Sequence, residues 1–396
     1  MNAALEILES LGCRVQHYGH TIVVDSTVLS ANRISREAMA RMRSSILFLG
    51  PLLARTGEGK VHQPGGCPLG ERPVDLHLRG FNALGVETWW EEGRLTCCGK
   101  LKGGTCVLSY PSVGATENLI MAALGAEGET TICNAAKEPE IVDLIGFLCA
   151  SGARISGGGT GTVQITPGPL HGVEYAVMPD RAEAATWLAA AAATCGEVAL
   201  RGIYPQLLAS VLDRYMAAGC VLWKDEDMLA IRAPERLNAV GVIRTGPYPG
   251  FPTDAQAPVM ASFLRAKGIT VFEETVFSDR YHHVPAFRSV GANITTESTL
   301  AVVTGVERTH GAQMWATDLR GGAAMVVAAL AAEGQSCVFG LEHIRRGYEN
   351  LTEKLCGLGA RIEEVKDEPA GDCQGGSYHE QGSIQASLQQ RRSPAE

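Results

Sequence analysis

The chain has 396 residues, of which 45% are hydrophobic and 6% aromatic, and its formal net charge at pH 7 is −9. This is enough apolar material for two ordinary domains, and the acidic balance argues against nucleic-acid binding, so an anionic substrate needs a local cluster of basic side chains. No apolar run is long enough to span a membrane and the first residues lack the basic flank of a signal peptide, so we expect an α/β protein of the cytoplasm that does not bind membranes.

The chain contains 12 scattered cysteines, and none of them forms a Cys-x-x-Cys pair. This spacing indicates neither a zinc site nor a set of disulfides, and we expect most of the thiols to be small core residues. The sequence therefore predicts no metal.

One pattern recurs six times along the chain: an apolar helical stripe, a glycine, and a short run of β-type residues. Glycine just after the last helical turn can adopt the left-handed conformation, so each copy predicts a helix followed by a strand. The copies lie 67 to 73 residues apart, with their glycines at Gly12, Gly85, Gly152, Gly219, Gly291 and Gly359.

A second pattern, a helix rich in small residues followed by Gly and a strand, lies between these glycines. It occurs in five copies, at residues 42–61, 112–132, 180–200, 253–271 and 317–338. Only eleven residues precede Gly12, so we expect the first repeat to lack its opening strand and most of its first helix. The two patterns together predict six βαβαββ-like repeats.

Six repeats divide into two groups of three, which predicts a first domain over residues 1–179 and a second over 180–367. Helices rich in Ala and Gly are suited to close packing against each other or against a sheet. The remaining residues, 368–396, are rich in Gly, Ser and Gln and have no apolar periodicity, so we expect a disordered tail.

Cys67 lies in the stretch Gly-Gly-Cys-Pro-Leu-Gly, residues 65–70, where glycines permit a mobile loop that exposes a side chain. A thiol with Arg72 nearby can serve as nucleophile or proton donor, and a buried turn cysteine is the alternative. The stretch Arg72-Pro73-Val74-Asp75-Leu76 suits a ligand with phosphate and NH or OH groups, or it forms an exposed salt bridge. Ser112 and Val113 open a helix, which predicts an anion site or a plain N-cap.

Asp254 follows three prolines in Pro-Tyr-Pro-Gly-Phe-Pro-Thr-Asp, residues 247–254. This indicates a carboxylate fixed at the mouth of a helix as a general base or a ligand of a substrate hydroxyl. Arg280, Arg320 and Arg346 occur at predicted element ends of the second half. They are either surface charges or three cations that converge on one small polyanion. His282 and His283 have no metal-ligand spacing, and we interpret them as structural.

The ordered motifs MRSSI, PGGCPLGERPVDLHL, PSVGATEN, NAAKEPEIVDL, MPDRAEAATWL, YPGFPTDAQA, ETVFSDRYHHV, ATDLR and HIRRGYE resemble those of the UDP-N-acetylglucosamine 1-carboxyvinyltransferase family of enolpyruvyl transferases. The resemblance runs from about residue 4 to residue 367. It implies an inside-out α/β fold of two similar domains, each with three βαβαββ repeats whose helices lie inside and whose sheets lie outside.

The resemblance also implies a reaction: the enolpyruvyl group of phosphoenolpyruvate passes to the 3-hydroxyl of UDP-N-acetylglucosamine and phosphate is released, without metal or organic cofactor. This reaction is the first committed step of peptidoglycan precursor synthesis, and hence part of cell-wall biogenesis, cell shape and division. Inhibition by fosfomycin is a further implication.

The roles of the site residues follow from the same resemblance. Cys67 matches the general acid toward the methylene carbon of phosphoenolpyruvate, and Asp254 matches the carboxylate at the sugar hydroxyl. Arg320 and Arg346 match the residues that hold the donor's carboxylate and phosphate, and Arg280 and Asp318 match supporting residues. The nucleotide-sugar ligands match Arg43, Arg72, Pro73, Val74, Asp75, Leu76, Ser112, Val113 and Val276.

Two features of the family have no counterpart here, an initial strand and a Ser-Gly-Ala-Lys-Asn loop that contacts both substrates. Because the lysine of that loop binds the donor phosphate, we expect the chain as given to have little transferase activity. Three alternatives therefore stay open: a fragment of a full enzyme that is active, an inactive or regulatory relative that binds nucleotide sugar, and an enolpyruvyl transferase acting on another nucleotide acceptor.

Overall fold

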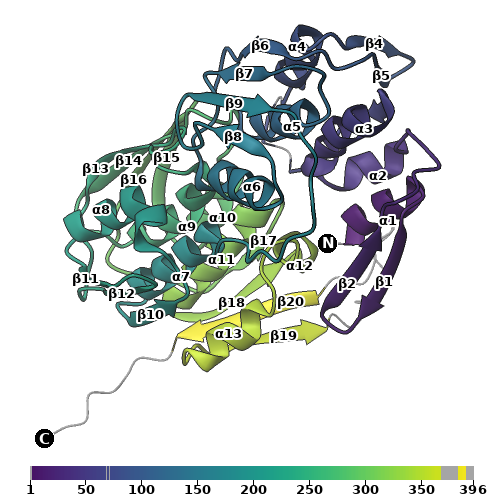
Figure 1. Ribbon diagram of the computed structural model, residues 1–396. Helices are drawn as coiled ribbons and strands as arrows, with labels where there is room; N and C mark the ends of the chain where they lie inside the picture. The colour runs from purple at the N-terminus through teal and green to yellow at the C-terminus, as the bar shows by residue number, and fades with distance from the viewer. Residues whose placement is uncertain (1, 68, 71, 367–381, 389–396) are drawn as a thin grey trace, which may run out of the picture. The chain divides into compact units, whose positions relative to one another are not determined.

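The computed structural model describes residues 2–67, 69–70, 72–366 and 382–388 (Figure 1). The chain forms two compact units: an N-terminal unit of residues 1–67 and 72–178, and a C-terminal unit of residues 68–71 and 179–396. Each unit has its own hydrophobic core. No helix of the described residues is long and apolar enough to cross a membrane.

The six predicted junctions of helix, glycine and strand are confirmed. The helices concerned are α1 (Asn2–Ser10), α4 (Asp75–Ala83), α6 (Pro139–Ala150), α8 (Ala209–Ala217), α10 (Val284–Ser289) and α13 (Leu351–Gly357). The glycine after each of them has a φ between 88° and 100°. A side chain would be strained in this left-handed region, which explains why glycine stands at all six positions.

The N-terminal unit holds three sheets. The first pairs β1 (Arg14–Tyr18) with β2 (Thr21–Asp25); the second has the order β3 (Glu58–His62), β5 (Arg94–Cys98), β4 (Glu87–Glu91); the third has the order β6 (Gly104–Val107), β7 (Thr130–Cys133), β9 (Thr162–Thr166), β8 (Arg154–Ser156). Its other helices are α2 (Arg36–Arg41), the 3-10 helix η1 (Arg43–Phe48), α3 (Leu49–Thr56) and α5 (Val113–Ala123). The first sheet thus has the fewest strands.

The C-terminal unit repeats this arrangement. Its sheets have the orders β10 (Glu197–Arg201), β12 (Met228–Arg232), β11 (Val221–Lys224); β13 (Gly241–Arg244), β14 (Ile269–Glu273), β16 (Leu300–Thr304), β15 (Asn293–Glu297); and β17 (Gln313–Trp315), β18 (Gly334–Phe339), β20 (Gly382–Leu388), β19 (Ile362–Lys366). Its other helices are α7 (Arg181–Ala193), η2 (Pro205–Leu208), α9 (Thr253–Phe263), α11 (Leu319–Ala331) and α12 (Leu341–Ile344). In the third, fifth and sixth sheets the first two strands are parallel and the last two form an antiparallel pair.

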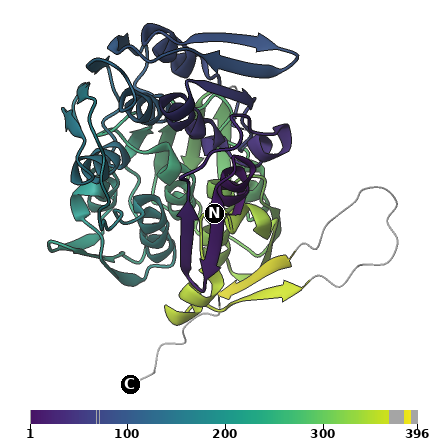
Figure 2. The same cartoon turned by 45° about the vertical axis from the view of Figure 1, so that its right-hand side comes forward.

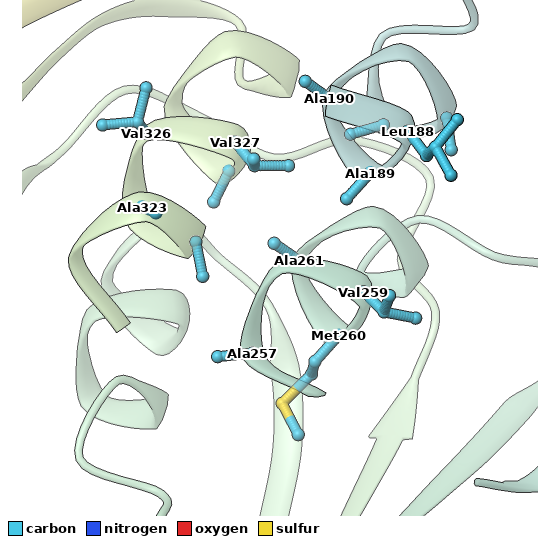
Figure 3. Close-up of a cluster of buried hydrophobic side chains, with 14 of the residues drawn as sticks. Leu188, Ala189, Ala190, Ala257, Val259, Met260, Ala261, Ala323, Val326 and Val327 are labelled. Atoms are coloured by element: carbon cyan, nitrogen blue, oxygen red, sulfur yellow. The ribbon is translucent and has the colours of Figure 1, made fainter. Parts of the chain in front are cut away.

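Three helices form the centre of the C-terminal unit. Helices α7, α9 and α11 pack against one another, and nearly all of their residues are buried. Figure 3 shows the cause: Ala189 and Ala190 of α7, Ala261 of α9 and Val327 of α11 lie in one cluster of small side chains. Short side chains let helix axes approach closely, and a helix that is apolar on every side must be buried. This arrangement confirms the predicted fold, with helices inside and sheets outside.

The predicted disorder of residues 368–396 is wrong for residues 382–388. These residues form β20, which lies between β18 and β19 and is antiparallel to both (Figure 2). Ile384 and Ala386 are each 1% exposed and belong to the core. The strand forms because every repeat with a complete sheet ends in two antiparallel strands, and β19 alone supplies only one of them. The other residues of the predicted tail, 368–381 and 389–396, lie outside the described residues.

Candidate active site

The N-terminal ends of α9 and α11 carry the two charged side chains at the centre of the site. Asp254 lies in the first turn of α9, and Arg320 lies in the first turn of α11. Asp318 is the N-cap of α11, and its Oδ1 accepts hydrogen bonds from the backbone N–H groups of Arg320 (3.1 Å) and Gly321 (3.0 Å). The cap fixes the start of the helix and therefore the backbone position of Arg320.

Asp254 and Arg320 form a direct ion pair. Arg320 donates from Nε (3.3 Å) and from Nη2 (3.1 Å) to Oδ2 of Asp254. The Arg320 side chain is 12% exposed, whereas the Asp254 side chain is 49% exposed. A carboxylate fixed at a helix start but open to solvent can accept a proton from a ligand, and a guanidinium beside it can hold an anion.

Arg280 joins this pair to a second carboxylate. Its side chain is 2% exposed, and its Nη2 lies 3.8 Å from Asp254 Oδ1 while its Nη1 lies 3.6 Å from Asp318 Oδ1. It also donates from Nη2 to the carbonyl of Thr253 at 3.1 Å. Two acidic partners balance this buried charge, which would otherwise be costly to desolvate.

These charges shift the pKa values of the pair in opposite directions. Desolvation raises the pKa of Asp254, but Arg320 and Arg280 outweigh it and hold the pKa of that carboxyl below its usual value. Burial opposes the charge of Arg320, yet Asp254 and Tyr348 raise the pKa of its guanidinium above the usual range. Both groups are therefore ionised at neutral pH.

Two residues that the sequence analysis did not single out complete the surroundings of Arg320. The Tyr348 hydroxyl accepts a hydrogen bond from Arg320 Nη1 at 3.0 Å, and it lies 2.8 Å from Oγ1 of Thr186 on α7. Both side chains are 2% exposed. Tyr348 stands two positions after the predicted site residue Arg346, whose side chain is exposed. No sequence pattern linked Tyr348 or Thr186 to Arg320.

Val276 lies in the turn after β14, and hydrogen bonds to the buried carboxylate of Glu274 stabilise this turn. Glu274, 1% exposed, accepts from the backbone N–H groups of Val276 (2.8 Å) and Phe277 (3.1 Å) through Oε1. Its Oε2 accepts from Thr253 Oγ1 at 3.0 Å, directly before Asp254. Glu274 therefore connects the turn at Val276 to the start of α9, and the sequence analysis missed it.

In the N-terminal unit, Arg43 lies against the stretch that begins at Arg72. Arg43 Nη2 donates to the carbonyl oxygens of Arg72 and, at 3.3 Å, of Pro73. Burial and the neighbouring charge of Arg72 lower the pKa of Arg43 to about 10. Two guanidinium groups held this close favour a bound anion, because an anion cancels their repulsion.

The three residues after Pro73 open α4. Val74 is the N-cap of this helix and is buried, Asp75 is its first residue, and Leu76 follows. Ser112 is the N-cap of α5 and accepts from Ala115 N at 3.3 Å, so Val113 is the first residue of that helix. The plain N-cap that we considered for Ser112 is therefore present.

Cys67 is half-buried and follows a tightly packed glycine pair. A Cβ on Gly65 would stand 1.7 Å from the Ala40 carbonyl oxygen, and one on Gly66, at φ 121°, would stand 3.0 Å from Arg43 Cβ. Gly65 N also donates to the Met39 carbonyl at 2.9 Å. These two glycines therefore allow close packing of the chain before Cys67.

The described residues contain no group of three His, Cys, Asp or Glu side chains that could hold a metal ion. Within the C-terminal unit the structure brings together Asp254, Arg320, Arg280 and Asp318, and within the N-terminal unit Arg43 and Arg72. His283 is 1% exposed and lies edge-on to the ring of Phe287 at 5.0 Å between centroids, as expected for a structural residue.

Two units of βαβαββ repeats, with buried helices and outer sheets, have the fold of the enolpyruvyl transferases. Solved structures agree on the fold. The enolpyruvyl transferase NikO from Streptomyces tendae aligns with a TM-score of 0.78 and 24% identity, over 90% of this chain and 86% of that one. An EPSP synthase from Acinetobacter baumannii aligns with a TM-score of 0.64 and 19% identity, over 89% and 86%.

Sequence comparison assigns the chain to a family. A family profile described as EPSP synthase (3-phosphoshikimate 1-carboxyvinyltransferase) matches residues 1–355, and the chain belongs to this family. Its curated relatives include UDP-N-acetylglucosamine 1-carboxyvinyltransferase 2 of Carboxydothermus hydrogenoformans, 46% identical over 367 residues that cover 92% of this chain and 87% of the relative. A UDP-N-acetylglucosamine 1-carboxyvinyltransferase of Gloeobacter violaceus is 46% identical over 360 residues, 90% of this chain and 78% of the relative.

Proposed function

We propose that this protein transfers the enolpyruvyl group of phosphoenolpyruvate to the 3-hydroxyl of UDP-N-acetylglucosamine and releases phosphate. The observation that carries the proposal is the position of Asp254, a solvent-accessible carboxylate in the first turn of a buried helix and in contact with Arg320. The names of relatives that are 43–46% identical over about nine-tenths of the chain support this choice of substrates.

Each chemical step has a candidate residue. Asp254 takes the proton of the sugar hydroxyl while the hydroxyl oxygen bonds to carbon 2 of phosphoenolpyruvate. Cys67 gives a proton to the methylene carbon, which forms a tetrahedral adduct. Loss of a proton from the resulting methyl group then breaks the bond from carbon 2 to the phosphate oxygen, and the enolpyruvyl ether and phosphate leave.

Binding of the two anionic substrates falls to the arginines. Arg320 and Arg346 hold the carboxylate and phosphate of the donor, since a planar guanidinium forms two parallel hydrogen bonds with such groups. Arg43, Arg72–Leu76, Ser112, Val113 and Val276 hold the nucleotide sugar. Arg280 and Asp318 support Asp254 and the start of α11.

We also propose that this reaction serves peptidoglycan precursor synthesis in the cytoplasm and that Cys67 is the target of fosfomycin. The sequence similarity supports these assignments.

The test is phosphate release by the full chain supplied with UDP-N-acetylglucosamine and phosphoenolpyruvate, with mass spectrometry of the nucleotide product. We expect release that depends on both substrates, and a loss of about 10²- to 10⁴-fold in Asp254→Asn, which keeps the shape but cannot accept the proton. Binding of the nucleotide sugar without any phosphate release would favour the inactive relative. Release only with another nucleotide would favour the different acceptor.

A further inference from the structure

Arg320 is held on two edges of its guanidinium by groups of different character. On one edge Nε and Nη2 face Asp254 Oδ2, whose side chain is half exposed and also lies near Arg280. On the other edge Nη1 faces the hydroxyl of Tyr348, which is 2% exposed. One partner is therefore accessible to substrate, and the other lies within the core.

The hydrogen bonds beyond Tyr348 have a defined direction. Arg320 can only donate, so the Tyr348 oxygen accepts from it, and because the single Thr186 proton is used toward a carbonyl, we assign the Tyr348 proton to Thr186 Oγ1 at 2.8 Å. The Thr186 hydroxyl in turn donates to the backbone carbonyl of Ala182 at 3.1 Å. The series ends on the main chain of α7, a helix whose start is fixed by the Asp180 side chain at the N–H groups of Ala182 (2.8 Å) and Glu183 (3.0 Å).

Each member of this series is satisfied, so the Tyr348 oxygen is held with its lone pairs toward Arg320. Burial raises the pKa of Tyr348 although Arg320 lowers it, and the hydroxyl therefore keeps the proton that Thr186 accepts. The Tyr348 ring adds a further contact, because the Arg320 Cζ lies 5.4 Å from its centroid.

We infer that Tyr348, oriented by Thr186, is a positioning residue that holds Arg320 in the orientation in which it receives the anionic donor. The inference rests on the proposed function. If Asp254 turns to the sugar hydroxyl, its bonds to Arg320 weaken, and the Tyr348 hydroxyl is the partner that stays. Without that hydroxyl the guanidinium is fixed by Asp254 alone, and the donor must then compete with Asp254 for it.

The variant Tyr348→Phe tests this role because it removes the hydroxyl and keeps the ring. We expect the KM for phosphoenolpyruvate to rise about tenfold, the size of effect typical of a lost hydrogen bond to a charged group, while the KM for UDP-N-acetylglucosamine changes less than about twofold. Thr186→Val removes the acceptor for the Tyr348 proton and should raise the same KM by a smaller factor. Thr186→Ser keeps that acceptor and should behave like the wild type.

Tyr215→Phe is the matched control. Tyr215 is a fully buried tyrosine of the same unit whose hydroxyl lies 3.2 Å from Ser262 Oγ, so the variant also loses a buried hydroxyl. It should lower the thermal midpoint without a change in either KM. A merely structural role of Tyr348 would give the same result as this control, and would overturn the inference.

Calorimetric titration of phosphoenolpyruvate, with and without UDP-N-acetylglucosamine, separates this inference from the proposed function. If the wild type binds phosphoenolpyruvate and Tyr348→Phe binds it about tenfold more weakly, the inference stands even in a chain that shows no turnover. Equal affinities of the two proteins would overturn it whether or not the wild type is active. A wild type that does not bind phosphoenolpyruvate would overturn it as well.

Discussion

Asp254 is the residue whose surroundings decide how it can act. The carboxylate accepts from Arg320 and lies near Arg280, so in the absence of substrate it is held in its ionised form. Such a carboxylate is a weak base until a ligand draws the guanidinium away. An anionic donor bound to Arg320 would do this, and the basicity of Asp254 would then rise when the donor is present.

The pairing of Asp254 predicts how stability depends on pH. Its folded-state pKa is below the unfolded value of about 3.9, so the ionised carboxylate stabilises the fold above that pH, and this contribution is lost as pH falls through the lower folded pKa. We expect Asp254→Asn to lower the thermal midpoint at pH 7 and to lower it less at pH 3. The midpoints of both proteins at the two pH values provide the check, and an equal difference at both would contradict it.

The proposed role of Arg320 predicts that its loss raises the KM of one substrate more than that of the other. The alanine of Arg320→Ala cannot form the two parallel hydrogen bonds that a guanidinium makes with a carboxylate. The KM for phosphoenolpyruvate should therefore rise by more than about tenfold, and by more than the KM for UDP-N-acetylglucosamine. Steady-state kinetics with each substrate varied in turn measure this. Equal increases for both substrates would mean that Arg320 supports the fold of the unit rather than the donor.

Cys67 predicts a pattern of inhibition. If its thiol is the proton donor, fosfomycin should modify it in preference to the other 11 cysteines, and UDP-N-acetylglucosamine should promote the reaction. Cys67→Ser should nearly abolish turnover because a hydroxyl is a much weaker acid. Cys67→Asp should keep activity and lose inhibition, because a carboxyl donates a proton but opens the epoxide poorly.

Peptide mass mapping after fosfomycin treatment, with and without the nucleotide sugar, identifies the modified residue. The buried thiols serve as internal controls: burial raises the pKa of Cys97 to about 12 and of Cys106 to about 11, so neither should react. An adduct on another cysteine of an active protein would refute the role of Cys67.

At the scale of the elements, the same helix–glycine–strand unit serves both structure and site. The glycine ends one helix and precedes an outer strand. The other helix of the repeat is buried, and its N-terminal end is free to carry site residues. In α9 and α11 these ends carry Asp254 and Arg320. Backbone N–H groups at a helix start favour negative charge, so an ionised Asp254 and a bound donor anion are both stabilised there.

The strand β20 predicts the effect of shortening the chain. Removal of residues 367–396 takes Ile384 and Ala386 out of the core and separates β18 from β19, so the thermal midpoint of the C-terminal unit should fall by several degrees. Removal of residues 389–396 alone is the matched control and should leave the midpoint unchanged.

Differential scanning calorimetry of the two shortened proteins and the full chain provides the measurement. Ile384→Ala should lower the midpoint in the same direction, since it removes a side chain that is 1% exposed, at a cost of about 2–5 kcal/mol. If the longer truncation melts like the full chain, β20 does not contribute to the stability of the unit.

At the scale of the whole molecule, the net charge is −9, yet each of the two units contains a local group of arginines. In the N-terminal unit Arg43 lies beside Arg72, and in the C-terminal unit Arg280 and Arg320 share Asp254. Affinity for anions therefore comes from these groups and not from the overall field. The chain also has two separate cores, one in each unit, so each arginine group is fixed by the packing of its own unit.

The sequence by itself determined the six repeats, because their signal is local: a glycine in the left-handed conformation after a helix, at near-constant spacing. It also placed Asp254 and Ser112 at helix starts, since the residues that mark a helix start act within one turn. The same repeat pattern held a signal for β20 that we missed. The sixth repeat lacks its last strand if the chain is read only to residue 367.

Only the tertiary structure decided which distant residues meet. Thr186 and Tyr348 are 162 positions apart, and Arg320 and Asp254 are 66 apart. The second pair arises because α9 and α11 pack side by side through small side chains, and the first because Tyr348, which lies between α12 and α13, reaches α7. No periodicity along the chain encodes such a meeting, since it depends on how three buried helices align, and this is why Tyr348, Thr186 and Glu274 emerged from the folded structure alone.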